Sequence, residues 1–116
     1  MNEYLVLLRE DPSTFTRMSP SEMQAVIQRY SAWVGQLRSQ GRLSVGKKLT
    51  DEGGRMLRAE KGRMVASTGP YAEVRDVVSG LFIISAASYE DAQALLADCP
   101  HLEFGHIELR EVDKVG

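Results

Sequence analysis

Two short runs of the chain, 4–8 and 81–84, consist of apolar residues: Tyr-Leu-Val-Leu-Leu and Leu-Phe-Ile-Ile. A strand that faces water on one side alternates apolar and polar residues, whereas a strand covered on both sides is apolar throughout. The turn formers 11–13 end the first run, and Gly80 precedes the second. Both runs are therefore predicted to be strands of a sheet that is buried on both faces.

A long amphipathic helix is predicted to begin after Ser19. Ser19 can cap the free N–H groups of the first turn, Pro20 suits the first helical position, and Glu22 completes a capping box. Gly41 is typical of the residue that follows a helix. Between Ser19 and Gly41, apolar residues recur at steps of three and four: Met23, Val26, Ile27, Tyr30, Trp33, Val34 and Leu37. Trp33 belongs to this stripe and is expected to pack in the core.

The middle of the chain reads as strands. Residues Leu43–Leu49 are predicted to form one strand. Arg55–Ala59 and Arg63–Ser67 flank Lys61-Gly62, a spacing typical of a hairpin with a two-residue turn. Half of the basic residues fall between positions 42 and 63, and no aromatic residue lies among them. A solvated hairpin face is favoured for them over a site for an anionic ligand or acidic partner.

The last third of the chain predicts one short helix and one strand. Ser88 and Asp91 form a second capping pattern, and Cys99-Pro100 ends the helix that follows. From His106 to Val112 polar and apolar residues alternate, which indicates a strand that is covered on one face.

The order of these elements predicts an α+β fold of the ferredoxin-like βαββαβ type with an extra β-hairpin. The chain has 116 residues, and one domain over 1–116 is expected. Two helices can cover only one face of such a sheet, although its two apolar strands call for cover on both. The missing cover is predicted to be a second copy of the chain, so that a homodimer forms through the helix-free sheet face.

Composition excludes several classes of partner. The net charge is −2 and the pI is about 5.7, so neither nucleic acid nor a membrane surface is expected to bind. No apolar run approaches the length of a membrane span. Cys99 is the sole cysteine, and no apolar signal segment is found at the N-terminus, so a cytoplasmic location is expected.

No cofactor or metal is expected. Residues Gly41–Lys47 fit the start of a phosphate-binding loop, but Lys48 stands where Ser or Thr is required and the stretch leaves a helix instead of opening one. Cys99 could be paired with His101 or His106 as nucleophile and base, or be a packed thiol; the packed thiol is favoured at a helix C-terminus. These three residues are too few and too poorly spaced for zinc.

The turn that precedes the second apolar strand is the best candidate for a functional site. Gly69 and Pro70 restrict the backbone, so that Tyr71 and Glu73 leave the turn in defined directions. In one reading, Glu73 accepts a proton from a ligand and Tyr71 covers an apolar surface. In the other, Glu73 pairs with Arg75 or Arg110, and Tyr71 fills the dimer core. Both readings stay open.

The chain resembles the YCII-related family, and its DGPF-motif branch in particular. The resemblance is carried by the capped helix with Tyr30, Trp33, Leu37 and Gly41, by Gly69-Pro70-Tyr71-Ala72-Glu73, and by Cys99-Pro100, Gly105, Ile107-Glu108 and Arg110. The chain departs from the branch at Thr68, Tyr71, Val74 and Ser79. Thr68 stands where the branch has an aspartate, so a role for that carboxylate is not transferred.

This resemblance implies a dimeric α+β barrel with a small-molecule cleft in each subunit. Related proteins use a histidine on the first helix with an aspartate as a catalytic pair, and one member is a dehydrochlorinase. Tyr30 occupies the histidine position here, and a tyrosine with a pKa of about 10 is a poor base at neutral pH. The candidate ligand-binding residues are Tyr71 and Glu73, with Tyr30, His106 and Arg110 as neighbours.

Two functions are compatible with these observations. The first is a cytoplasmic homodimer that binds a small organic molecule, with weak lyase-type or hydrolase-type acid/base chemistry. The alternative is a non-catalytic regulatory or interaction module, because DGPF-like domains resemble components associated with transcription initiation.

Overall fold

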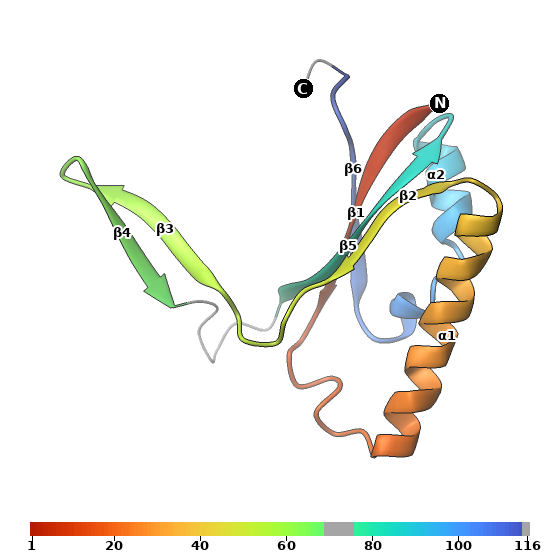
Figure 1. Ribbon diagram of the computed structural model, residues 1–116, viewed down its shortest axis with the longest axis horizontal. Helices are drawn as coiled ribbons and strands as arrows, with labels where there is room; N and C mark the ends of the chain where they lie inside the picture. The colour runs from red at the N-terminus through yellow and green to blue at the C-terminus, as the bar shows by residue number, and fades with distance from the viewer. Residues whose placement is uncertain (69–75, 115–116) are drawn as a thin grey trace.

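The computed structural model describes residues 1–68 and 76–114 and has a four-stranded antiparallel sheet at its centre. The strands are β1 (Asn2–Glu10), β2 (Leu43–Lys48), β5 (Val77–Ala86) and β6 (His106–Glu111), in the order β2-β5-β1-β6. Helices α1 (Pro20–Ser39) and α2 (Tyr89–Leu96) lie on one side of this sheet (Figure 1). This strand order and element sequence confirm the ferredoxin-like α+β fold predicted from the sequence.

Helix α1 begins and ends as its sequence predicts. The backbone N–H of Glu22 donates to Ser19 Oγ at 3.1 Å, and the Glu22 carboxylate accepts from the Ser19 N–H at 3.0 Å, which completes the capping box. Gly41 follows the helix with φ of 70°, a conformation that favours glycine. Trp33 is buried, packs edge-on against Phe82 of β5, and donates from its indole N–H to Asp98. The helix is therefore attached to the sheet through its predicted apolar stripe.

The two faces of the sheet differ in what covers them. Tyr4, Val6 and Leu8 of β1 are buried under the helices, as are the β5 residues that pair with them. The intervening side chains point to the helix-free face and are only half-buried. Its apolar members are Leu5, Leu7, Val45, Val78, Leu81 and Ile83. The sequence prediction of strands apolar on both faces is thus matched by an apolar, partly exposed sheet face.

Strands β3 (Arg55–Glu60) and β4 (Arg63–Thr68) form a separate two-stranded ribbon, which we call the arm. Lys61 and Gly62 both have positive φ, which is characteristic of the two-residue hairpin turn that the sequence predicts. The arm projects from the sheet on the side away from α1 and α2 (Figure 1). It accounts for a radius of gyration of 16.2 Å, whereas a compact chain of this length has about 13 Å.

Two features of the fold were not predicted. Strands β1 and β5 continue beyond their apolar runs to Glu10 and Val77, because ladder hydrogen bonds need backbone groups and not apolar side chains. In addition, a 3-10 helix, η1 (Pro100–Glu103), follows Cys99. Among the residues that the structure describes, the buried polar ones are His101 of η1 and Glu10 of β1. Both line the cavity that is the candidate site.

Candidate functional site

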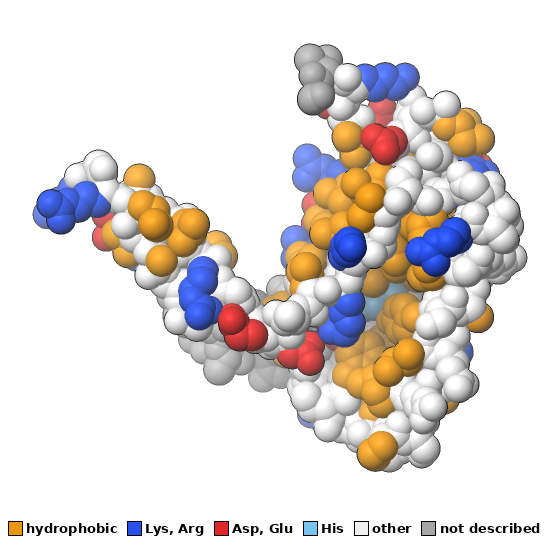
Figure 2. Space-filling view, viewed as in Figure 1, with side chains coloured by type: hydrophobic (Ala, Val, Ile, Leu, Met, Phe, Trp, Pro, Cys, Tyr) orange, Lys and Arg blue, Asp and Glu red, His pale blue; other side chains and the backbone are white. Residues whose placement is uncertain are grey.

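A cavity of about 400 Å³ lies between α1 and the sheet. Figure 2 shows it as a hollow on one face of the molecule, with hydrophobic side chains around it and a histidine at its base. The apolar side chains of its wall come from β1, the loop before α1, α1 and β5: Leu8, Phe15, Met23, Val26, Ile27, Val34 and Phe82. Ile27 belongs to the stripe of α1 yet is more than half exposed, because this part of the helix borders the cavity and not the packed core.

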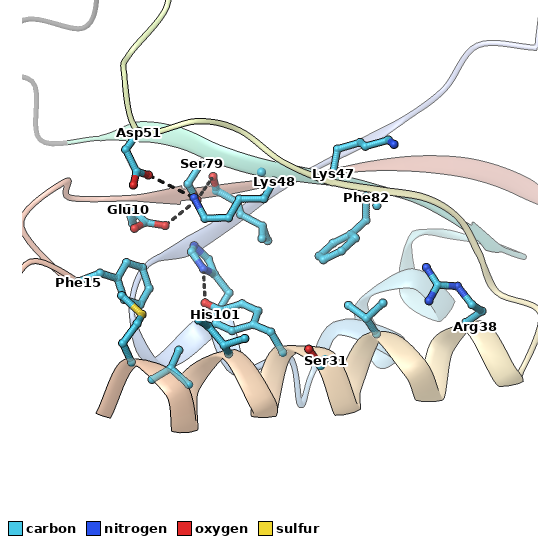
Figure 3. Close-up of a pocket in the computed structure, with 18 residues that line it drawn as sticks. Glu10, Phe15, Ser31, Arg38, Lys47, Lys48, Asp51, Ser79, Phe82 and His101 are labelled. Atoms are coloured by element: carbon cyan, nitrogen blue, oxygen red, sulfur yellow. Dashed lines mark hydrogen bonds and ion pairs between the residues drawn. The ribbon is translucent and has the colours of Figure 1, made fainter. Parts of the chain in front are cut away.

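His101 forms the base of the cavity and is fixed by two hydrogen bonds. Its Nε2 lies 2.8 Å from the carbonyl oxygen of Arg9, and its Nδ1 lies 2.8 Å from the hydroxyl oxygen of Tyr30 (Figure 3). A carbonyl oxygen can only accept, so Nε2 carries the proton and donates it to Arg9. In the neutral ring, Nδ1 therefore accepts from the Tyr30 hydroxyl. Both ring nitrogens are occupied, and His101 is 1% exposed.

Gly105 makes room for this arrangement. A Cβ atom at this position would collide with the Arg9 carbonyl oxygen and would lie 3.0 Å from His101 Nε2. The backbone N–H of Gly105 also donates to the His101 carbonyl oxygen, which closes the turn after η1. A side chain at residue 105 would therefore displace the strand that holds His101.

Glu10 is the second buried polar group of the cavity wall. It is the last residue of β1, is 7% exposed, and accepts a hydrogen bond of 2.6 Å from Ser79 Oγ. The register of β1 and β5 shifts here, since Leu8 pairs with Gly80 and Arg9 with Val78, so that Ser79 is the extra residue of a β-bulge. The bulge brings the Ser79 hydroxyl toward the carboxylate, and Figure 3 shows the two together at one end of the cavity.

The opposite end of the cavity is basic. Figure 3 shows Arg38 on α1 at this end, whereas the side chain of Lys47 on β2 points away from α1, because Lys47 pairs with Leu81 of the helix-free face. Neither side chain forms a hydrogen bond or an ion pair with another residue that the structure describes. Lys48 also lines the cavity, but its ammonium is 3.2 Å from the solvent-exposed carboxylate of Asp51. The cavity thus has an apolar middle, a carboxylate at one end and one uncompensated cation, Arg38, at the other.

Burial changes the acidity of two groups near the base of the cavity. Burial, reinforced by the neighbouring Cys99, raises the pKa of Tyr30 well above its ordinary value. Burial also raises the pKa of the Cys99 thiol to about 11. Cys99 is therefore a packed thiol and no nucleophile at neutral pH, as favoured from the sequence. Tyr30 is a hydrogen-bonding group and no base.

The structure separates the site residues that the sequence predicts. Tyr30 lies in the cavity wall. His106 and Arg110 lie on the helix-free face of the sheet, where His106 is 3.4 Å from Asp76 and Arg110 is 3.4 Å from Glu108, and neither lines the cavity. Tyr71 and Glu73 lie outside the described residues. The roles of all five in ligand binding stay predictions.

Sequence reasoning missed Glu10 and Ser79 and considered His101 only as a partner of Cys99. Glu10 could have been found, because it continues the inward alternation of Tyr4, Val6 and Leu8 and is the polar member of that series. Ser79 carries no such signal, since its direction depends on the bulge.

Neither a metal site nor a membrane span is found in residues 1–68 and 76–114. No three side chains of the His, Cys, Asp and Glu types gather there in a way that could hold a metal ion. No helix there combines the length and apolarity needed to cross a bilayer.

Comparison with known proteins gives one family. The YCII-related domain matches residues 2–115 of the chain. Among curated proteins, no sequence matches it. Among solved structures, the 5-chloro-2-hydroxyhydroquinone dehydrochlorinase TftG of Burkholderia phenoliruptrix AC1100, in complex with 2,5-dihydroxybenzoquinone, is similar with a TM-score of 0.47 and 19% identity. The similarity covers 96% of this chain and 93% of that one.

Proposed function

The chain belongs to the YCII-related domain family, and we propose that it binds a small organic acid in the cavity beneath α1, with Glu10 as the group that exchanges a proton with it. The observation that carries this proposal is the buried Glu10 carboxylate, held by Ser79, in the wall of a cavity whose middle is apolar. A buried carboxylate is costly to keep in a core, so its place at a cavity wall favours a role with a ligand.

The size and lining of the cavity suit a small molecule. Ligand sites typically have volumes of about 300–1,000 Å³, apolar walls and a few convergent polar groups. The cavity of about 400 Å³ fits the lower part of this range. Phe15 and Phe82 contribute flat apolar surfaces, while Glu10 and the Tyr30 hydroxyl oxygen contribute hydrogen-bond acceptors. The ligand therefore has an apolar body and a hydroxyl or similar donor at its inner end.

The outer end of the ligand carries a negative charge. Arg38 of α1 borders this end of the cavity, and no described acidic side chain neutralises it. A ligand carboxylate at this end would pair with the Arg38 guanidinium, whereas a neutral group would leave that charge uncompensated. Because the Arg38 side chain is exposed, we expect this pair to contribute less than about 1 kcal/mol to binding.

Proton transfer is assigned to Glu10 and not to His101. His101 has no free nitrogen, since one donates to Arg9 and the other accepts from Tyr30. Glu10 has one oxygen bonded to Ser79, and an ionised carboxylate has further acceptor sites. Acid/base chemistry of the lyase or hydrolase type would use this carboxylate as the base.

The dimer belongs to the same proposal. The helix-free sheet face exposes an apolar patch that a second copy of the chain would cover, giving the dimeric barrel expected from the sequence. His106 and Arg110 lie on this face, and we propose that they contact the second subunit. Tyr71 and Glu73 stay proposed ligand contacts, because in the sequence they precede by only a few residues the strand β5 that carries Ser79. A cytoplasmic location is proposed from the single buried thiol.

A ligand screen with matched variants tests this function. The probes are apolar hydroxycarboxylic acids and their uncharged amides, and the readouts are binding by calorimetry and turnover by product analysis. We expect the acids to bind more tightly than the amides. Glu10→Gln is expected to lower affinity or turnover with little change in melting temperature. Glu90→Gln, at an exposed carboxylate of α2 that does not line the cavity, should change neither. A Glu10→Gln variant that binds every probe as the wild type does, with altered stability only, would assign Glu10 a structural role.

A further inference from the structure

The arm is amphipathic, with one face that is apolar except at its base, where Arg55 pairs with Thr68. Alternation along β3 and β4 places Leu57, Ala59, Met64 and Ala66 on the same face, since Leu57 pairs with Ala66 and Ala59 with Met64. We call these four residues the arm face. The charged residues Arg58, Glu60 and Arg63 lie on the opposite face together with Met56 and Val65, while Arg55, which pairs with Thr68, lies at the base of the arm on the same side as the arm face. A ribbon with this pattern is suited to be covered on one side.

Nothing in the described part of the chain covers the arm face. Leu57 is 62% exposed and Met64 is 68% exposed. The strands of the arm pair only with each other, and the arm stands clear of the domain (Figures 1 and 2). A two-stranded hairpin without packing is at best marginally stable in water. A partner that is always present is therefore needed to hold the arm in its ribbon form.

The charges of the chain are divided between arm and body. The whole chain has 14 basic and 16 acidic residues, of which the arm, residues 55–68, holds four basic and one acidic. The remainder thus holds ten basic and fifteen acidic residues. The arm is positive and the body of any copy of this chain is negative. This complementarity favours the approach of the arm to a second copy at long range, while the contact itself is assigned to the apolar arm face.

The position of the arm leads to the same partner. It leaves the sheet on the helix-free side, so that the arm and the helix-free face border the same space in Figure 1. A second copy seated on the helix-free face would occupy that space. We propose that the arm face packs on the second copy. Each arm of the dimer then contacts the other subunit, and we call this pair of contacts the clasp. This inference rests on the dimer proposed above and adds the arm as a second, separate part of its interface.

Polar substitutions on the two faces of the arm test the clasp. Leu57→Gln with Met64→Gln removes apolar contacts from the arm face without changing charge, and Met56→Gln is the matched control on the opposite face. The dimer dissociation constant is measured by analytical ultracentrifugation over a dilution series. Burial of one large apolar side chain is worth roughly a tenfold change in affinity or more, so the double variant is expected to raise the constant at least about tenfold. The control is expected to leave it unchanged.

The outcomes separate the clasp from the dimer itself. Leu7→Lys, which places a charge at the centre of the helix-free face, is expected to abolish the dimer whether or not the arm contributes. A double variant that dimerises as tightly as the wild type would overturn the clasp and leave the sheet-face dimer standing. A wild-type protein that stays monomeric throughout the series would overturn both. All variants lie outside the buried core, so folding can be verified by the unchanged near-ultraviolet spectrum of Trp33.

Discussion

At the base of the cavity, three residues fix the position of the buried His101. Arg9 and Tyr30 bind its ring nitrogens, and Gly105 has no side chain that would displace it. His101 is useful as a fixed wall because its two nitrogens are bound by groups from β1 and α1. This pairing keeps the Tyr30 oxygen directed at the cavity while it prevents His101 from acting as a base. The hydrogen bonds of His101 to Arg9 and Tyr30 therefore fix the base of the cavity without any contribution from a ligand.

Gly105→Ala is expected to destabilise the protein, because the new methyl group would collide with the Arg9 carbonyl oxygen. Relief of the clash requires movement of β1 or loss of its bond to His101, at a cost of about 1–3 kcal/mol. Urea unfolding measures this, with Gly35→Ala as the control, since a methyl group at Gly35 meets nothing within 4 Å. If the Gly105→Ala protein and the wild type had equal free energies of unfolding, there would be room for a methyl group beside the Arg9 carbonyl oxygen and His101, which would contradict this account.

The burial of the Cys99 thiol is expected to make the free energy of unfolding depend on pH. Burial raises its pKa to about 11 in the folded protein, whereas the exposed thiol of the unfolded chain titrates near 8.5. Between these values the unfolded state has lost a proton that the folded state keeps. The free energy of unfolding is therefore expected to fall as the pH rises from about 9 to 11, and the fall should be smaller in Cys99→Ala. Identical pH profiles of the two proteins over this range would contradict the burial of the thiol.

At the scale of the elements, the sequence was informative wherever a pattern is local. The capping box of Ser19, the stripe through Trp33 and the Lys61-Gly62 turn depend on neighbours within a few residues, and all three are confirmed. The cavity depends on residues distant in sequence. Glu10 meets Ser79 only through a bulge in the pairing of β1 with β5, and no local pattern specifies where a ladder slips.

The N-cap of α1 is the most direct test at this scale. Ser19→Ala removes the acceptor for the Glu22 N–H and half of the capping box, and is expected to cost about 1 kcal/mol of unfolding free energy. Gln24→Ala, at an exposed position of the same helix, should cost little or nothing. Because α1 forms one wall of the cavity, Ser19→Ala is also expected to weaken ligand binding. Equal unfolding free energies for the two variants would contradict the role of the cap.

At the scale of the whole molecule, one sheet serves two purposes on its two faces. The face under the helices packs the core and borders the cavity, while the other exposes Leu5, Leu7, Leu81 and Ile83 beside the arm. We propose that the first face binds the ligand and that the second binds another copy of the chain. The arm then extends the second face beyond the edge of the sheet.

The central claim is that the ligand lies under α1, and amide chemical-shift mapping tests it most directly. The uniformly ¹⁵N-labelled protein is titrated with the tightest hydroxycarboxylic acid from the screen. We predict that the largest shifts arise at Glu10, Tyr30 and Ser79 and that they are reduced in Glu10→Gln. Shifts confined to His106 and Arg110 on the helix-free face, with none in the cavity wall, would contradict the account.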